Sequence, residues 1–352
     1  MICTNGQKVL KASGADAVYT SCEYMMRYLT GMAAEDGCVV VDQSGTTFYT
    51  DSRYIEAARK LFQGTDVTPA FHKKNEVLER LAGYSSVGIS FSQTAHSEYL
   101  TLEKAGVKAV DADKAFTDSM ITKSEWELVN IERACNIAED AFNMLLPEIR
   151  EGMTETAVAA MLEYNMRKLG AQGLSFETIG AFGANGSVPH HETGLTTLKF
   201  GDSILIDFGC RVNGYCSDIT RTFLFGDDGK HEDFKKAYNH VLAAHNLAQE
   251  KIVAGMTGAQ ADAIAREYLK ANGYGELFTH SLGHGIGLNV HEAPYVSPRA
   301  GNDTLCDGMV FSDEPGVYVE GEYGIRIEDT VVLKNGKVQS MMGKTQKTLL
   351  IL

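Results

Sequence analysis

The first third of the chain alternates short strand-forming runs with stretches of helical spacing. The predicted strands are 17–19, 38–41, 46–49 and 87–90, with a turn at 42–45 between the second and the third. The predicted helices are 53–62 and 75–81. This alternation indicates a small α/β domain that ends near the polar stretch 111–123.

The rest of the chain begins with a strongly marked amphipathic helix. Ser124 and Glu127 have the spacing of a capping box, and apolar residues then recur at steps of three and four. Gly152 is expected to break this helix, and Thr154 to begin a second one that stops at Gly170. Two further helices are predicted at 232–252 and 260–271. Helices grouped beside antiparallel strand pairs make this part α+β.

Composition narrows the class of protein. The chain has 352 residues, 44% of them hydrophobic, and a net charge of −14 from 32 basic and 46 acidic side chains. The acidic balance argues against nucleic acid or an anionic membrane as a partner, and the apolar runs are too short for a membrane span. Seven cysteines, an odd number, are typical of free thiols in a reducing compartment. We therefore expect a cytoplasmic protein.

A strand and a tight turn bring two acidic residues toward one another. An apolar strand carries Asp207 near its end, and Asn213-Gly214 is a strong signal for a two-residue hairpin loop. In that register Asp218 lies opposite Gly209, and Asp207 is its diagonal neighbour on the same face, roughly 7 Å away at the backbone. Carboxylates so placed repel one another, and a divalent metal ion would remove the repulsion. The alternative, acids on an exposed hairpin, is disfavoured by the apolar strand.

A second pair of acids has the same arrangement. Glu314 and Glu328 are equally distant from Gly321, so a hairpin with an odd-length loop around that glycine would place them directly opposite. Arg326 shares the strand face of Glu328 and could orient a ligand carboxylate. From spacing alone, an ordinary surface ion pair is an equally good interpretation of Arg326.

Histidines gather in two places. His280, His284 and His291 lie within twelve residues, beside glycines that let the backbone approach closely. His190 and His191 follow a proline in a loop rich in glycine and asparagine. A single histidine is usually structural, whereas this grouping favours a site. The histidines predicted to be solvated side chains without a role are His72, His96 and His231.

These segments together resemble the pita-bread metallopeptidases, the family of methionine aminopeptidase, Xaa-Pro aminopeptidase and prolidase. The matching stretches are Ile206–Gly209, Ser217–Thr222, Gly283–Gly287, His291–Pro294, Glu314–Tyr318 and Gly324–Asp329. Near the N-terminus, Arg27–Gly31 and Thr50–Tyr54 resemble the creatinase-type N-terminal domain. The resemblance implies an α+β pita-bread catalytic domain over 119–352, preceded by a smaller α/β creatinase-like domain over 1–118. The extra domain points toward the Xaa-Pro enzymes and away from methionine aminopeptidase.

By position, the resemblance implies five ligands for two divalent metal ions, with Asp218 and Glu328 bridging the pair. The ligands are Asp207, Asp218, His284, Glu314 and Glu328. Four carboxylates and one imidazole are a hard set that favours Mn²⁺, as does the family precedent. Co²⁺ would also fit, and Zn²⁺ or Fe²⁺ suits the set less well.

The resemblance also implies the reaction, which is hydrolysis of the peptide bond before a proline. Water activated by the two ions attacks the scissile carbonyl, and Glu314 carries the proton to the leaving imino nitrogen. His190 and His291 would contact the substrate around the scissile bond, with His280 beside the pocket and Arg326 as a further substrate-binding residue. The expected partners are small peptides with proline in second position and, by family precedent, a second copy of the chain in a homodimer.

One departure from the family bears on the substrate. Tyr295 stands four residues after His291, where prolidases often have an arginine that holds the carboxylate of a dipeptide. This favours an Xaa-Pro aminopeptidase acting on longer peptides, although Arg299 lies near enough in sequence to substitute. The alternatives are an Xaa-Pro dipeptidase and a non-catalytic pita-bread peptide-binding protein. The complete ligand set argues against the binding protein and against creatinase, which needs no metal.

Overall fold

The computed structural model describes residues 4–352, which divide into two compact units, one that ends at Met120 and one that spans Ile121–Leu352. The boundary expected from the sequence, between residues 118 and 119, stays a prediction. Each unit has its own sheets and core, and each is described by itself.

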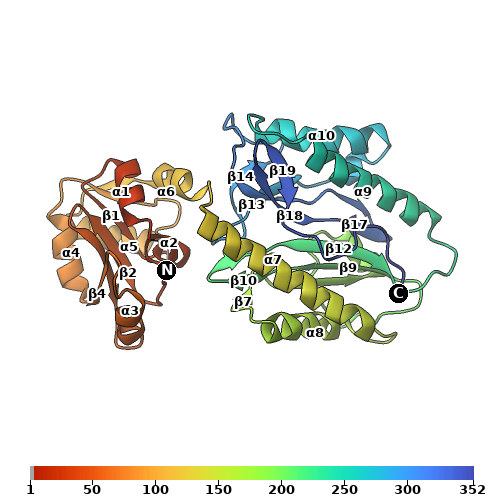
Figure 1. Cartoon of the computed structure of the whole chain (residues 1–352), viewed down its shortest axis with the longest axis horizontal. Coiled ribbons are helices and arrows are strands. Elements are labelled where there is room, and N and C mark those ends of the chain that lie inside the picture. Colours follow the sequence, from red (N-terminus) through yellow and green to blue (C-terminus); the bar gives the residue numbers. More distant parts are fainter. Residues whose placement is uncertain (1–3) are drawn as a thin grey trace. The chain divides into compact units, whose positions relative to one another are not determined.

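The first unit is built on one six-stranded sheet in the order β4-β3-β2-β1-β5-β6, with helices packed around it (Figure 1). The strands are β1 (Ala17–Thr20), β2 (Cys38–Asp42), β3 (Gly45–Thr50), β4 (Val67–Phe71), β5 (Val87–Ile89) and β6 (Ala109–Asp111). The helices are α1 (Gly6–Ser13), α2 (Glu23–Thr30), α3 (Ile55–Leu61), α4 (Lys74–Ala82), α5 (His96–Lys104) and α6 (Asp113–Met120). Strand β2 is central and wholly buried, which explains why it is an unbroken apolar run rather than an alternating one.

The second unit contains four long helices joined to antiparallel strands. The helices are α7 (Glu125–Leu145), α8 (Glu155–Lys168), α9 (Glu232–Lys251) and α10 (Gly258–Ala271). The predicted capping box is present at the start of α7, where the Ser124 side chain accepts from the backbone of Glu127 and the Glu127 side chain accepts in return. The expected end of this helix at Gly152 was wrong. The α-helix ends at Leu145, because Pro147 in the 3₁₀ turn that follows has no N–H to continue the ladder.

The strands of the second unit form short sheets in the orders β12-β9-β8, β11-β10-β7, β14-β13-β15-β18-β19 and β16-β17. The first group is β7 (Gly173–Leu174), β8 (Ile179–Phe182), β9 (Ser203–Phe208), β10 (Cys210–Val212), β11 (Tyr215–Cys216) and β12 (Ile219–Leu224). The second is β13 (Gly283–Gly285), β14 (Glu292–Val296), β15 (Val310–Asp313), β16 (Gly316–Val319), β17 (Tyr323–Arg326), β18 (Asp329–Lys334) and β19 (Lys337–Ser340).

The two groups of strands meet at β12. The amide of Glu328 donates to the carbonyl of Thr220 at 3.1 Å, and the hydroxyl of Thr222 donates to the carbonyl of Arg326 at 2.9 Å. Helix α7 packs along α8, and α9 packs along α10. Figure 1 shows these two helix pairs on different sides of the strands. The apolar side chains of α9 and α10 share one core with those of β15, β17 and β18. The seam at β12 therefore brings together strands from both halves of the unit.

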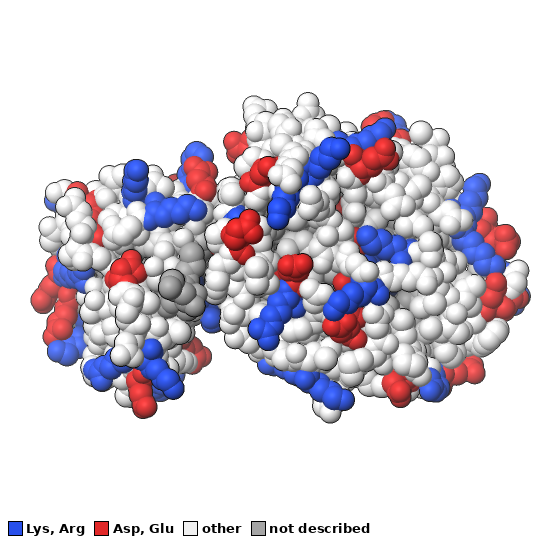
Figure 2. Space-filling view, viewed as in Figure 1, with Lys and Arg blue, Asp and Glu red and all other residues white. Residues whose placement is uncertain are grey.

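The surface carries charges of both signs. On the face seen in Figure 2, basic and acidic side chains are interspersed over both units. Within residues 4–352, no helix is long and apolar enough to cross a membrane.

Candidate metal centre

Strands β9 and β12 position the first two acids. The pairs Val212–Tyr215 and Thr220–Asp207 belong to one continuous register around the two-residue loop, as the turn predicted. Asp218 therefore falls opposite Gly209. Glycine is required there, because a Cβ at residue 209 would lie 2.0 Å from the carbonyl oxygen of Ser217. This close approach brings Asp218 and Asp207 to the same end of the strand pair.

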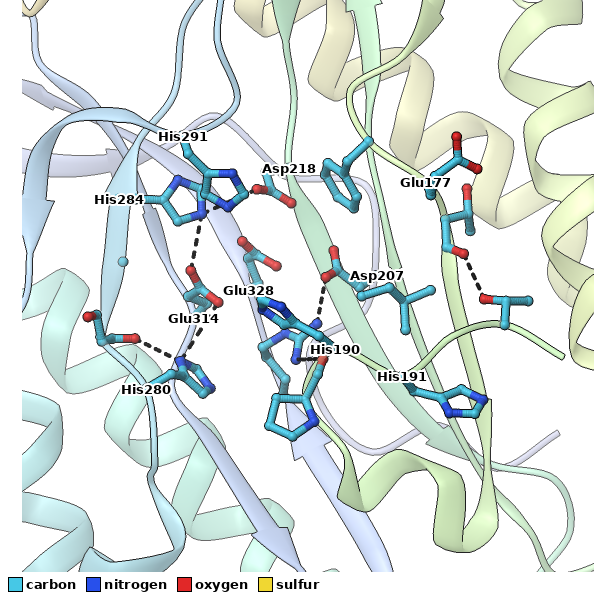
Figure 3. A pocket seen from close by; sticks show the side chains of 18 of the residues that line it. Glu177, His190, His191, Asp207, Asp218, His280, His284, His291, Glu314 and Glu328 are labelled. Atoms are coloured by element: carbon cyan, nitrogen blue, oxygen red, sulfur yellow. Dashed lines mark hydrogen bonds and ion pairs between the residues drawn. The ribbon is translucent and has the colours of Figure 1, made fainter. Parts of the chain in front are cut away.

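The second pair of acids follows the register predicted around Gly321. Strands β16 and β17 pair Gly316 with Arg326, and β15 and β18 continue the same register by pairing Asp313 with Asp329. Glu314 and Glu328 occupy the matching positions in between. The amide of Glu328 is bonded to β12, which carries the first pair of acids next to the second. All four carboxylates converge in Figure 3.

His284 completes this cluster from β13. Its Nδ1 donates to the carbonyl of Gly285 at 3.2 Å, so Nε2 carries the lone pair of the neutral ring. That lone pair faces Oε1 of Glu314 at 3.4 Å and Oδ2 of Asp218 at 3.6 Å. Burial also lowers the pKa of His284, which keeps the ring neutral. A lone pair directed at two carboxylate oxygens is an arrangement that a cation would stabilise.

The electrostatics of the acids support the same interpretation. Burial, and then repulsion by the neighbouring carboxylates, raises the pKa of Asp218 and of Glu328 well above the usual range. Burial raises the pKa of Glu314 to about 7. Oδ1 of Asp207 is buried without a hydrogen-bond partner among the described residues. Ligand atoms of Asp218, His284 and Glu328 lie within 4.8 Å of one another, so this set fits divalent metal ions.

Arg326 is a buried residue whose guanidinium contacts the acid cluster. Its side chain is 3% exposed, so the interpretation as an ordinary surface ion pair was wrong. Nη2 donates to Oδ2 of Asp207 at 2.5 Å and Nε to the hydroxyl of Thr220 at 3.0 Å, which in turn donates to Glu328 at 2.6 Å. Nη1 donates to the hydroxyl of Tyr318 at 2.9 Å. The guanidinium therefore orients one acid directly and a second through Thr220.

The remaining predicted histidines border the same cavity in different ways. His280 accepts from the hydroxyl of Tyr318 at Nε2, 2.8 Å away, and burial lowers its pKa to about 3. The ring of His291 packs against that of His284 with centroids 4.2 Å apart, and partial burial lowers the pKa of His291 to about 4. His190 lines the same cavity and projects among the acids in Figure 3.

His191 is the histidine that the structure separates from the cluster. Its Nε2 lies 2.9 Å from a carboxylate oxygen of Glu155, on the side of the cavity away from the acids (Figure 3). The histidines predicted to be without a role, His72, His96 and His231, do not line this cavity.

The cavity has a volume of about 630 Å³, enough for a short peptide. Besides the residues already described, its walls include Phe176, Glu177, Ile179, Glu192 and Tyr295. The predicted acids and histidines thus line one cavity within the second unit.

Three residues of the site were missed by the sequence analysis. Thr220 lies two residues after Asp218 on the same strand face, and Tyr318 is in the stretch that follows Glu314, so alternation could have indicated both. Glu155 had no such signal, because its partners come from a loop that is distant in sequence.

Comparisons with known proteins agree with this arrangement. A family model described as metallopeptidase family M24 matches residues 129–335, and another described as creatinase/prolidase N-terminal domain matches residues 4–119. An Xaa-Pro dipeptidase of Pyrococcus furiosus is 34% identical over 97% of each chain. The structure of an Xaa-Pro dipeptidase from Bacillus anthracis superposes with a TM-score of 0.91 at 33% identity, covering 98% of both chains. An X-Pro aminopeptidase structure from Thermotoga maritima gives 0.89 at 33% identity, covering 98% of this chain and 99% of the other. The predicted fold class, a creatinase-like domain followed by a pita-bread catalytic domain, is confirmed.

Proposed function

Because the chain belongs to metallopeptidase family M24, we propose that it is an Xaa-Pro aminopeptidase that removes the residue preceding proline from short peptides. The observation that carries this choice is the charge of the cavity wall. Arg326 is the one lysine or arginine among the described residues that line the cavity. Its three nitrogens already donate to Asp207, Thr220 and Tyr318. A dipeptide carboxylate, which follows directly on proline, therefore finds no other lysine or arginine among the described residues of the cavity wall.

In this proposal Asp207, Asp218, His284, Glu314 and Glu328 hold two divalent metal ions, with Mn²⁺ preferred and Co²⁺ as the alternative. The unpartnered Oδ1 of Asp207 and the lone pair of His284 are the donor atoms that support the assignment most directly. When bound, such a pair of ions lowers the pKa of water to give a nucleophile and polarises the scissile carbonyl.

The protein groups handle the proton and orient the peptide. Glu314 can take up the proton released by the water nucleophile and give it to the imino nitrogen that leaves with proline. His190 and His291 would hydrogen-bond the substrate on either side of the scissile bond. The low pKa of His291 keeps its ring neutral at neutral pH, so it can both accept and donate.

The second candidate is an Xaa-Pro dipeptidase. It is favoured by the names of relatives such as the Pyrococcus furiosus and Bacillus anthracis proteins. In that case Arg299, on the loop after β14, would have to bind the carboxylate of the dipeptide, because the side chain of Tyr295 carries no positive charge. Tyr295 lines the cavity and is 59% exposed, so a peptide that extends beyond proline can pass over its ring.

The test is Mn²⁺-dependent hydrolysis of an Xaa-Pro dipeptide and of a matching Xaa-Pro-Xaa tripeptide, with Asp218→Asn as the control. We expect cleavage of the tripeptide that disappears in the control. Cleavage of the dipeptide alone would identify a dipeptidase, and an Arg299→Ala variant that loses this cleavage would locate its carboxylate site. Cleavage of neither peptide by metal-loaded protein would refute both candidates.

We further propose that the enzyme acts in the cytoplasm as a homodimer. Family precedent supports the assembly, and the cysteine usage supports the compartment. All the cysteines that the structure describes are free thiols. Light scattering at micromolar concentration tests the dimer, since a monomer mass would contradict it.

A further inference from the structure

Glu155 is a fully buried carboxylate with an unusual set of partners. It is the first residue of α8 and is 0% exposed. Oε1 accepts from the amide of Phe182 at 2.9 Å and from Nδ2 of Asn185 at 2.8 Å. Oε2 accepts from Nε2 of His191 at 2.9 Å and from the amide of Gly194 at 3.0 Å. All four donors belong to the segment 182–194, which carries His190.

The location of Glu155 makes its charge favourable. Burial alone would raise its pKa, but the hydrogen bonds from Asn185, His191 and the two amides lower it below the usual value. The N-terminus of α8 adds the favourable end of a helix dipole. Glu155 is therefore an ionised anchor around which the loop is wound.

The loop is also bonded to the backbone of the same helix turn. The amide of Glu155 donates to the carbonyl of Thr196 at 3.1 Å. The amide and the hydroxyl of Thr156 both donate to the carbonyl of Gly194, at 3.0 and 2.6 Å. The first turn of α8 thus offers donors and acceptors to the returning end of the loop.

Contacts of the two flanking residues restrain the backbone of His190. The carbonyl of Pro189 accepts from Nη1 of Arg326 at 3.3 Å, and the imidazole of His191 is bonded to Glu155. His190 itself is exposed at the cavity. A side chain at the surface of a cavity can be held in one place only if its backbone is held, and the two flanking residues supply that restraint.

We propose that Glu155 is a positioning residue of the reaction, which acts through the loop 182–194 to place His190 against the substrate. The inference rests on the function proposed above, in which His190 contacts the peptide. Glu155 lies outside the set of residues that line the cavity, so its effect is transmitted by the loop.

The variant Glu155→Gln exposes this role because an amide cannot accept from all four donors. If its NH₂ group faces Phe182 and Asn185, it opposes two donors. If it faces His191 and Gly194, the imidazole can change tautomer, but the amide of Gly194 loses its acceptor. In either orientation the loop loses part of its attachment. We expect kcat to fall roughly 10²-fold, as for misplacement of a reacting group by about 1 Å, with KM and bound metal nearly unchanged.

The experiment is a double-mutant cycle on kcat for Xaa-Pro-Xaa cleavage with Glu155→Gln, His190→Ala and the double variant. A positioning residue that acts through His190 has little further effect once His190 is removed. Amide hydrogen exchange over 182–194 in the metal-free protein gives a readout besides activity, and it should quicken in Glu155→Gln. Glu163→Gln, about two turns further along α8, is the matched control and should leave both readouts unchanged.

The outcomes separate the inference from the function beneath it. Equal losses from Glu155→Gln with and without His190 would overturn the positioning role and leave a purely structural one. Full activity in His190→Ala would instead overturn the role proposed for His190. If Glu155→Gln does not fold, Asn185→Ala removes one of the four donors, and the same lack of additivity is expected from it at a smaller size.

Discussion

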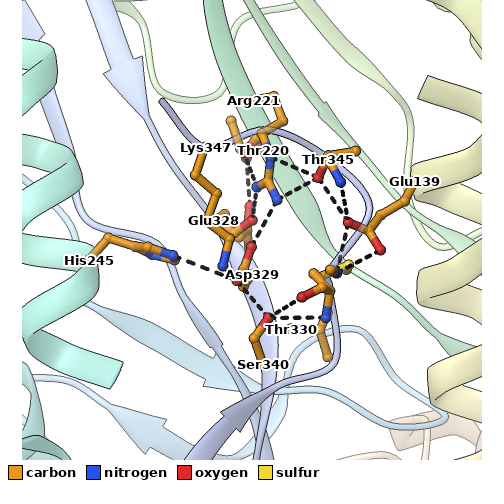
Figure 4. A network of polar contacts seen from close by, with 12 residues as sticks. Glu139, Thr220, Arg221, His245, Glu328, Asp329, Thr330, Ser340, Thr345 and Lys347 are labelled. Atoms are coloured by element: carbon orange, nitrogen blue, oxygen red, sulfur yellow. Dashed lines mark hydrogen bonds and ion pairs between the residues drawn. The ribbon is translucent and has the colours of Figure 1, made fainter. Parts of the chain in front are cut away.

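Two clusters of buried carboxylates flank the strand pair β15 and β18, and they differ in the hydrogen-bond donors that surround them. We call the cavity acids, which include Glu314 and Glu328, the front cluster, and Asp329 with Glu139 the back cluster. Glu314 and Glu328 face the cavity with few donors, as described above. Asp329, the residue after Glu328, faces the other way and accepts from Arg221 at 2.9 Å, Ser340 at 2.7 Å, Gln249 at 3.2 Å and Lys347 (Figure 4). Adjacent residues thus have opposite surroundings.

The difference appears directly in the ionisation of the two clusters. Although burial raises it, the pKa of Asp329 is held well below the usual range by Arg221 and His245, whereas the pKa of Glu328 is raised. Glu139 is satisfied in the same way as Asp329, since it accepts from the amides of Gly343, Lys344 and Thr345. Burial is common to both clusters, so the supply of donors decides their role. Asp329 and Glu139 are satisfied by donors within the protein, and the front cluster is complete only with cations.

The largest effect is expected from Glu328→Gln. The metal ions supply several kcal/mol of transition-state stabilisation, so kcat/KM should fall on the order of 10³-fold. The melting temperature of the metal-free protein should stay the same or rise, because the variant removes one of several repelling charges. Peptide hydrolysis and thermal unfolding without metal measure the two quantities. A clear loss of metal-free stability would mean that the front cluster is structural like the back one.

The neighbouring variant Asp329→Asn should show the reverse behaviour. It leaves the buried guanidinium of Arg221 without its anionic partner, which costs about 3–5 kcal/mol. We expect a lower urea midpoint in the metal-free protein. Ser340→Ala, which removes one donor to Asp329 of the several present, is the control and should cost only about 1 kcal/mol. An unchanged midpoint in Asp329→Asn would remove the distinction between the clusters.

The sequence predicted the front cluster far better than the back one. Asn213-Gly214 and Gly321 centre two hairpins, and counting residues outward from these turns places each acid beside its partner. The back cluster joins Arg221 to Asp329 and Glu139 to Thr345, contacts between segments that are more than a hundred residues apart. Such contacts depend on how β12, α7 and the C-terminal segment pack together, and no local turn signal specifies that packing. The same reason hid the partners of Glu155.

Thr220→Val tests whether the hydroxyl of Thr220 orients Glu328 for metal binding. The hydroxyl of Thr220 donates to Glu328 and accepts from Arg326, so valine leaves the carboxylate and the guanidinium each without one partner. Removing a residue that orients a metal ligand typically costs 10- to 100-fold, and we expect a loss of about that size in metal affinity, measured by titration with Mn²⁺. Thr220→Ser keeps the hydroxyl and should retain affinity. Equal losses in both variants would assign the effect to packing of the methyl group.

The smallest effect is expected from Glu314→Gln in the metal-free protein. The pH dependence of this effect distinguishes the front cluster from the back cluster. The folded-state pKa of Glu314 is about 7, above the usual 4.5, so between these values the folded state keeps a proton that the unfolded state has lost. Wild-type stability relative to the variant should therefore fall as the pH rises from about 4.5 to 7 and stay constant above. We expect the variant to melt a few degrees higher than wild type at pH 8 and at the same temperature near pH 4.5.

Two comparisons make that pH experiment decisive. Mn²⁺ should reverse the order at pH 8, because the ions favour the ionised glutamate that the variant lacks. The back cluster should respond at the other end of the scale: the pKa of Asp329 is lowered, so its stabilisation is present above about pH 3.8 and is lost only as the pH falls below that value. A difference in melting temperature between wild type and Glu314→Gln that does not change with pH would show that Glu314 is ionised in the metal-free fold. The front acids would then already have their counter-charge within the protein.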